Sequence, residues 1–355
     1  MSVKTVTVAQ ALDGLSQFDE VLDARSPAEF ALDHLPGAQS WPVLDDEERR
    51  IVGTLYVQQG PLPARKVGGP LVARNMASLV QRLAQDKPRE WQPLVYCWRG
   101  GQRSSALAWF LDQIGFRTTK LDGGYKAFRA LVRDQLASRP AAFTFRVLAG
   151  RTGSGKTRLL QALAAAGAQV LDLEGLACHR GSVLGGLPGQ PQPSQKRFDT
   201  LLWQALGALD PQREVYVESE SRKIGALQLP DALVACMHAS PTLRVEMPDA
   251  ARVQLLLQDY GFFAQQPDRF CSLLDGLVEL RGREQVKAWQ ALAQGGQWAE
   301  LYALLIRDHY DPLYLRSIRR HFNDYDQAPE VHLADGQAAT LAEAAQRLLQ
   351  APRPA

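Results

Sequence analysis

Residues 150–157, near the middle of the 355-residue chain, read GRTGSGKT and match the phosphate-binding pattern G-x-x-x-x-G-K-[ST] at every fixed position. Glycines let consecutive backbone N–H groups turn toward an anion, and the lysine and the start of the following helix add positive charge. The motif therefore predicts a phosphate or diphosphate site. Its residues are Gly150, Arg151, Thr152, Gly153, Ser154, Gly155, Lys156 and Thr157.

A second loop able to bind an anion starts at Cys97, where residues 97–105 read CWRGGQRSS. A thiol at the base of a glycine- and arginine-rich loop that runs into a helix favours the thiolate, because N–H groups and arginines stabilise its charge. We therefore interpret Cys97 as a nucleophile assisted by Arg99 and Arg103. The other cysteines lack such neighbours and are expected to be core residues: Cys178, Cys236 and Cys271.

Both loops need a strand before them and a helix after them. Residues 93–96 and 143–149 read as buried strands, and residues 158–166 as a helix closed by Gly167. Alternating strands and helices predict a mostly parallel sheet, with ligand sites at the carboxyl ends of its strands. Further strands are expected at 21–23, 170–174, 215–218, 233–237 and 243–246, helices at 198–209, 279–293, 298–307 and 313–321, and an irregular stretch at 41–66.

Acidic residues end two of the strands that neighbour the P-loop. Asp172 and Glu218 are therefore expected near the phosphate, and magnesium is the candidate ion, held by Thr157 and Glu218. No tightly bound cofactor is expected. An NTPase would end this strand with an aspartate, so Glu218 disfavours ATP hydrolysis. The long loop after residue 178 is expected to lie over the phosphate and to add His179 and Arg180 to the site.

Composition excludes several classes of protein. The net charge is only +2 with 46% hydrophobic residues, so the chain as a whole gives no sign of a nucleic-acid partner and any basic surface is local. No apolar run reaches the length of a membrane span, the N-terminus lacks the apolar core of a signal peptide, and no C-x-x-C pair occurs. We expect a reduced, cytoplasmic protein with no membrane partner.

From about residue 250 the chain is helical and locally basic, with aromatic residues interleaved. This mixture is typical of a surface that binds a phosphate backbone and stacks on bases, but also of a solvated helix face over core aromatics. The two interpretations stand equal. The candidate nucleic-acid-binding residues are Arg281, Arg283, Arg316, Arg319 and Arg320.

The first part of the chain resembles the rhodanese family. DAR at residues 23–25, HLPGA at 34–38, the Cys97 loop and LDGGY at 121–125 follow that family's order over residues 1–139. The resemblance implies a cysteine that carries sulfur. Five residues separate Cys97 from Arg103, one more than in the common rhodanese loop. The longer loop is similar to that of rhodanese-related phosphatases and arsenate reductases, which suits a tetrahedral oxyanion.

The predicted fold class is α/β, with a rhodanese-like domain at 1–139 and a P-loop α/β domain at 140–349 whose C-terminal region is helical. This combination resembles the bacterial tRNA 2-selenouridine synthase family, as do HRGS at 179–182, ESESRKIG at 218–225 and DHYDPLY at 308–314.

The resemblance implies a transferase that modifies 2-thiouridine at the wobble position of tRNA. The sulfur would first be geranylated from geranyl diphosphate and then replaced by selenium from selenophosphate. The P-loop would grip the diphosphate, and Cys97 with Arg99 and Arg103 would bind selenophosphate. Implied partners are the tRNA and a selenophosphate-producing enzyme. The alternative is a nucleotide-regulated sulfurtransferase or phosphatase-like enzyme, which would turn over ATP or GTP without tRNA.

Overall fold

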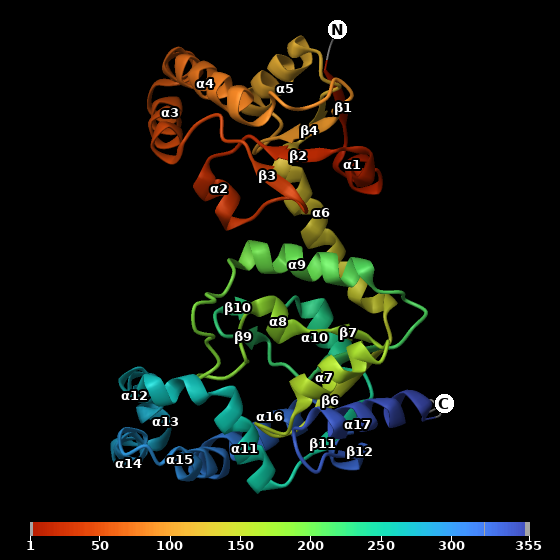
Figure 1. Cartoon of the computed structure of the whole chain (residues 1–355), viewed down its shortest axis with the longest axis vertical. Helices are drawn as coiled ribbons and strands as arrows, with labels where there is room; N and C mark the ends of the chain where they lie inside the picture. Colours follow the sequence, from red (N-terminus) through yellow and green to blue (C-terminus); the bar gives the residue numbers. More distant parts are fainter. Residues whose placement is uncertain (1–2, 323, 352–355) are drawn as a thin grey trace. The chain divides into compact units, whose positions relative to one another are not determined.

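The computed structural model describes residues 3–322 and 324–351, which form two compact units. The first unit comprises Met1–Gln135 and Ser194–Thr200, and the second comprises Leu136–Pro193 and Leu201–Ala355. Figure 1 labels the helices and strands of both units.

The first unit is built on a five-stranded parallel sheet in the order β1-β5-β4-β2-β3. The predicted strands at 21–23 and 93–96 are confirmed as β2 and β4. The strand bounds are Lys4–Val6 (β1), Glu20–Asp23 (β2), Ala38–Ser40 (β3), Pro93–Tyr96 (β4) and Thr119–Leu121 (β5). The helix bounds are Val8–Asp13 (α1), Leu15–Gln17 (η1), Pro27–Leu32 (α2), Gln102–Ile114 (α5) and Gly124–Ser138 (α6).

Residues 41–66 were expected to be irregular, and this prediction is wrong for most of the stretch. Helix α3 (Asp46–Gln59) and helix α4 (Pro61–Leu83) occupy it and continue beyond it. Asp45 accepts a hydrogen bond from the N–H of Glu48, whose own carboxylate accepts one from Asp45, so a capping box starts α3. The D-x-x-E spacing was a visible signal for this helix.

The second unit is built on a parallel sheet in the order β12-β11-β6-β8-β7. The prediction of a mostly parallel sheet is confirmed, with the P-loop strand β6 at its centre. The strand bounds are Phe145–Ala149 (β6), Gln169–Leu171 (β7), Val215–Glu218 (β8), Thr242–Glu246 (β11) and Glu330–His332 (β12), with Lys223–Ile224 (β9) and Leu227–Gln228 (β10) pairing separately. The helix bounds are Arg139–Ala142 (η2), Lys156–Ala165 (α7), Leu173–Ala177 (α8), Gln195–Ala208 (α9), Asp231–His238 (α10) and Ala338–Gln350 (α17).

Two expected strands are wrong in whole or in part. Residues 233–237 lie within helix α10, whose buried Leu233, Val234 and Met237 recur at helical spacing. A short apolar run does not by itself distinguish a buried strand from a buried helix. Strand β7 ends at Leu171, and the side chain of Asp172 then caps the next helix, so Glu174 lies on α8 instead of ending a strand.

The predicted helical region after residue 250 is confirmed. Its elements are Asp249–Asp259 (α11), Gly261–Gln265 (η3), Pro267–Asp275 (α12), Val278–Arg281 (α13), Arg283–Gln294 (α14), Trp298–Leu305 (α15), the π-helical turn Ile306–Tyr310 (η4), Asp311–His321 (α16) and Tyr325–Gln327 (η5). The helix expected at 279–293 is broken at Gly282, whose φ of 81° ends α13 and starts α14.

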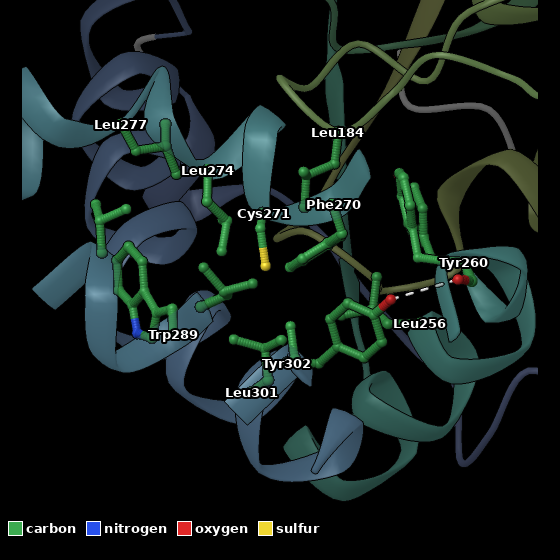
Figure 2. Close-up of a cluster of buried hydrophobic side chains, with 14 of the residues drawn as sticks. Leu184, Leu256, Tyr260, Phe270, Cys271, Leu274, Leu277, Trp289, Leu301 and Tyr302 are labelled. Carbon is green, nitrogen blue, oxygen red and sulfur yellow. Dashed lines mark hydrogen bonds between the residues drawn. The ribbon is translucent and has the colours of Figure 1, made fainter. Parts of the chain in front are cut away.

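These helices enclose an apolar cluster of their own. Figure 2 shows Trp289, Phe270, Leu274 and Tyr302 converging from α14, α12 and α15, with the Tyr302 hydroxyl donating to the Tyr260 carbonyl. The cluster fixes the positions of α11, η4 and α16, which carry residues of the site described below. No helix in residues 3–322 or 324–351 is long and apolar enough to span a membrane.

We expect Trp289→Ala to lower the free energy of unfolding of the second unit by about 3–5 kcal/mol, because the whole side chain is buried. Trp289→Phe is the matched control. It keeps an aromatic ring and removes an indole N–H that is buried with no hydrogen-bond partner among the described residues, so it should cost clearly less. Urea unfolding followed by circular dichroism measures both changes. A loss below about 1 kcal/mol for Trp289→Ala would contradict a packed cluster.

Candidate active site

The P-loop lies between β6 and α7, as the sequence predicted. Gly153 and Gly155 have φ values of 75° and 84°, a conformation that strains other residues. A β-carbon on either glycine would come within 3.1 Å of a neighbouring side chain, of Leu256 for Gly153 and of Met247 for Gly155. Both glycines are therefore required by the backbone and by the packing against the loop.

The P-loop borders a cavity of about 870 Å³, a volume suited to a small molecule larger than a diphosphate. Polar side chains of the P-loop and of the segment after β8 form one part of its lining. Helices α11 and α16 and the residue after α16 add an apolar wall that comprises Leu255, Leu256, Leu313, Ile318 and Phe322. The arrangement suits a ligand with a charged head and an apolar tail.

Lys156 and Tyr314 meet at this loop. The Lys156 ammonium donates to the Gly150 carbonyl at 2.6 Å and lies 5.5 Å from the centre of the Tyr314 ring. The Tyr314 hydroxyl accepts from the N–H of Gly150 at 2.6 Å and lies 3.0 Å from the hydroxyl of Ser219. Burial raises the pKa of Tyr314, so the hydroxyl remains neutral. This tyrosine joins α16 to both ends of the phosphate site.

Arg252 fixes the P-loop backbone from α11 and has no exposed surface. Its guanidinium donates to the Thr152 carbonyl at 2.7 Å and to the Asp311 carboxylate at 2.5 Å. Arg151 of the P-loop also donates to Asp311, at 3.3 Å. The sequence analysis missed Arg252, since no local motif marks it, whereas Asp311 lies in the DHYDPLY segment.

Three glutamates gather beside the P-loop: Glu174 of α8, Glu218 at the end of β8, and Glu220. One carboxylate oxygen from each lies within 4.8 Å of the others. The Thr157 hydroxyl donates to Glu174 at 3.3 Å. Burial, then the charge of Glu218, raises the pKa of Glu174 to about 9 and that of Glu220 to about 8. Glutamates at these pKa values hold protons at neutral pH.

The sequence placed one of these glutamates, Glu218, at the site and missed the other two. Glu174 was read as part of a strand, and Glu220 follows Glu218 in an ESES run that was the available signal. Asp172, expected near the phosphate, accepts from the N–H of Gly175 at 2.7 Å and caps α8. Its charge acts on Glu218 and Glu220 without joining the group of three.

The loop after residue 178 reaches the cavity through Arg180 and the three residues that follow it. Arg180 donates to the Asp259 carbonyl at 2.6 Å and lies 5.0 Å from the centre of the Tyr260 ring. His179 forms a bridge with Gly186 inside the loop, and burial lowers the pKa of its imidazole. Arg180 thus lines the cavity, whereas His179 is engaged in the loop itself.

In the first unit, Cys97 lies between β4 and α5, as expected. Its sulfur is buried, 3.1 Å from the hydroxyl of Ser104. Gly124 supports the loop, since a β-carbon there would come 2.3 Å from the Cys97 carbonyl oxygen. Arg103 donates to Glu29 at 2.5 Å, so part of its charge is already balanced, while Arg99 is exposed. The two arginines therefore differ in surroundings, which the sequence did not indicate.

The candidate nucleic-acid-binding arginines also differ in their surroundings. Arg281 donates to the ring and the carbonyl of His309, and Arg319 pairs with Asp326 at 3.0 Å. The remaining three side chains are exposed: Arg283, Arg316 and Arg320. Helix α16 carries Arg316, Arg319 and Arg320 and also lines the cavity with Ser317 and Ile318. Nucleic-acid binding by this helix stays a prediction.

Comparisons with known proteins match both units. A family model described as "tRNA 2-selenouridine synthase AAA domain" matches residues 143–281, and a "Rhodanese-like domain" model matches residues 7–131. Proteins named tRNA 2-selenouridine synthase are similar over most of the chain. The one from Cupriavidus pinatubonensis is 34% identical, that from Marinobacter nauticus 32% and that from Verminephrobacter eiseniae 36%, each match covering 83% of this chain and 87% of the relative.

We expect Arg252→Met to lower the free energy of unfolding of the second unit by about 3–5 kcal/mol, because Asp311 and the Thr152 carbonyl lose a buried charged donor. Arg307→Met is the matched control. It breaks an ion pair with Asp308 on the surface and should leave the urea midpoint nearly unchanged. Equal effects of the two substitutions would contradict the anchoring role of Arg252.

The glutamate cluster predicts a pH dependence of stability. A carboxyl group whose pKa is raised by folding stabilises the folded state below its unfolded pKa and loses this contribution as pH rises through its folded pKa. With a chelator present, the melting temperature should therefore fall as pH rises from about 6 to about 9, through the pKa values of Glu220 and Glu174. Glu220→Gln should reduce the fall. The same pH dependence in both proteins would show that the cluster does not hold protons.

Proposed function

The chain belongs to the tRNA 2-selenouridine synthase family, and on this basis we propose that it is a transferase that converts 2-thiouridine at the wobble position of tRNA to 2-selenouridine. Two separate anion-binding loops support a reaction in two steps. One has Lys156 beside an apolar wall, and the other has Cys97 at its base. We assign the steps to these loops in turn.

In the first step the 2-thiouridine sulfur attacks the carbon that bears the diphosphate of geranyl diphosphate. A C–S bond forms, the C–O bond breaks, pyrophosphate leaves with the bonding electrons, and the base releases its N3 proton. The P-loop N–H groups and Lys156 stabilise the charge that develops on the leaving group. The apolar wall of α11 and α16 supports an isoprenoid donor, because a hydrocarbon chain gains free energy when it leaves water.

In the second step selenophosphate binds at the Cys97 loop and its selenium attacks the ring carbon of the geranylated base. The C–S bond breaks, geranylthiol leaves with a proton, and water cleaves the Se–P bond to release phosphate and restore the N3 proton. Exposed Arg99 supplies positive charge for the oxyanion, with Arg103 behind it on Glu29. We propose that Cys97 acts in this step alone.

The proposed partners follow from these substrates. The tRNA supplies the 2-thiouridine, and an enzyme that makes selenophosphate supplies the labile selenium donor. The exposed arginines of α16 lie on the same helix as cavity residues Ser317 and Ile318, which supports a tRNA contact there. The feature that carries the proposed function is the cavity that combines a P-loop with an apolar wall.

We expect Lys156→Ala to slow geranylation by a factor of about 10²–10³, the usual effect of removing one stabiliser of transition-state charge. Cys97→Ala should keep geranylation and lose selenation, while Cys236→Ala, which removes a thiol far from both loops in sequence, should keep both. Mass spectrometry of nucleosides from 2-thiouridine tRNA, incubated with geranyl diphosphate and then with selenophosphate, measures the two products.

Two results would overturn the assignment of the steps. Loss of geranylation in Cys97→Ala would remove the separation between the loops. Unmodified tRNA together with consumption of ATP by the wild type would favour the nucleotide-regulated sulfurtransferase or phosphatase-like enzyme instead.

A further inference from the structure

We propose that Glu174, Glu218 and Glu220, together with the hydroxyl of Thr157, bind one hard divalent cation of the Mg²⁺ or Mn²⁺ class at the edge of the cavity. The sequence predicted magnesium at Thr157 and Glu218. The structure adds two carboxylates from separate segments, Glu174 of α8 and Glu220 after β8.

The spacing of the carboxylates suits a single small cation. Their candidate ligand atoms all lie within 4.8 Å of one another. Opposite oxygens around Mg²⁺ are about 4.2 Å apart and around Ca²⁺ about 4.8 Å apart, from metal–oxygen distances of roughly 2.1 and 2.4 Å. The three oxygens therefore need only a small side-chain rotation to share one ion. Carboxylate and hydroxyl oxygens are ligands that hard cations prefer.

Glu218 gives a second, independent indication of a ligand. The residue is only 4% exposed, and its Oε1 has no hydrogen-bond partner among the described residues. A buried carboxylate oxygen without a partner is costly, and such groups are usually paired or bound to metal. Glu218 faces two further carboxylates in place of a basic partner.

The charges around the cluster leave room for a cation. Lys156 is the nearby basic group, and its ammonium already donates to the carbonyls of Gly150 and Arg151. Asp172 adds negative charge from the start of α8. The backbone of Gly181 covers the cluster closely, since a β-carbon there would come 3.0 Å from Glu174 and 3.1 Å from Glu220. The site thus has negative charge, oxygen ligands and a lid of backbone.

A cation would also resolve a conflict in the proposed reaction. Three ionised glutamates beside a P-loop repel an incoming diphosphate, and one divalent ion attracts both sets of oxygens. This role in holding the diphosphate rests on the proposed function, whereas the cation site rests on the carboxylate geometry alone.

Isothermal titration of the full chain with MnCl₂, MgCl₂ and CaCl₂, without any substrate, tests the site. We expect one saturable site for Mn²⁺ and Mg²⁺ at about pH 8. Glu174→Gln and Glu220→Gln should each weaken Mn²⁺ binding at least tenfold, because each removes a charged ligand. Glu279→Gln, an exposed glutamate on α13, is the matched control and should bind as the wild type does.

Water-proton relaxation of bound Mn²⁺ provides a second readout, and circular dichroism establishes that each variant is folded. Absence of saturable Mn²⁺ binding in the wild type, or unchanged binding in Glu220→Gln, would overturn the proposal. Tighter binding of Ca²⁺ than of Mg²⁺ would overturn the assigned class of ion. Failure of geranylation by a protein that binds Mn²⁺ at this site would instead count against the proposed function and leave the cation site standing.

Discussion

An anion-binding loop and three carboxylates share one small volume in the second unit, and the charge between them is the constraint on which the site depends. Glu218 is buried at the end of β8, with Glu174 and Glu220 beside it. Their mutual repulsion and their burial both favour protons or a cation over free carboxylates. Any ligand with phosphate groups must therefore arrive at a site whose carboxylate charge is already balanced.

The helical region after residue 250 belongs to this site as much as the P-loop does. Arg252 and Asp311 tie α11 and α16 to the Thr152 carbonyl, and Tyr314 ties α16 to the N–H of Gly150. The same helices provide the apolar wall of the cavity. Because the cluster in Figure 2 packs these helices together, a phosphate-binding loop and a hydrophobic surface are held in fixed relation. This pairing distinguishes the cavity from a site for phosphate alone.

The sequence predicted the features that short motifs encode. The P-loop and the Cys97 loop were found because each is a local run of residues between a strand and a helix. Residues brought together from distant segments were missed, as Arg252, Glu174 and Glu220 show, since no spacing in the chain links them. The strand expected at 233–237 was wrong because a short apolar run carries no clear period. The pairing of Arg103 with Glu29 likewise depends on tertiary structure.

The central claim is that the cavity binds an alkyl diphosphate through the P-loop and the apolar wall. Calorimetric titration of the wild type with geranyl diphosphate and, separately, with ATP, both with MgCl₂, tests it most directly. The account predicts saturable binding of geranyl diphosphate, competition by pyrophosphate with lower affinity, and weaker binding of ATP without its hydrolysis. Tight binding and hydrolysis of ATP, with no binding of geranyl diphosphate, would contradict it.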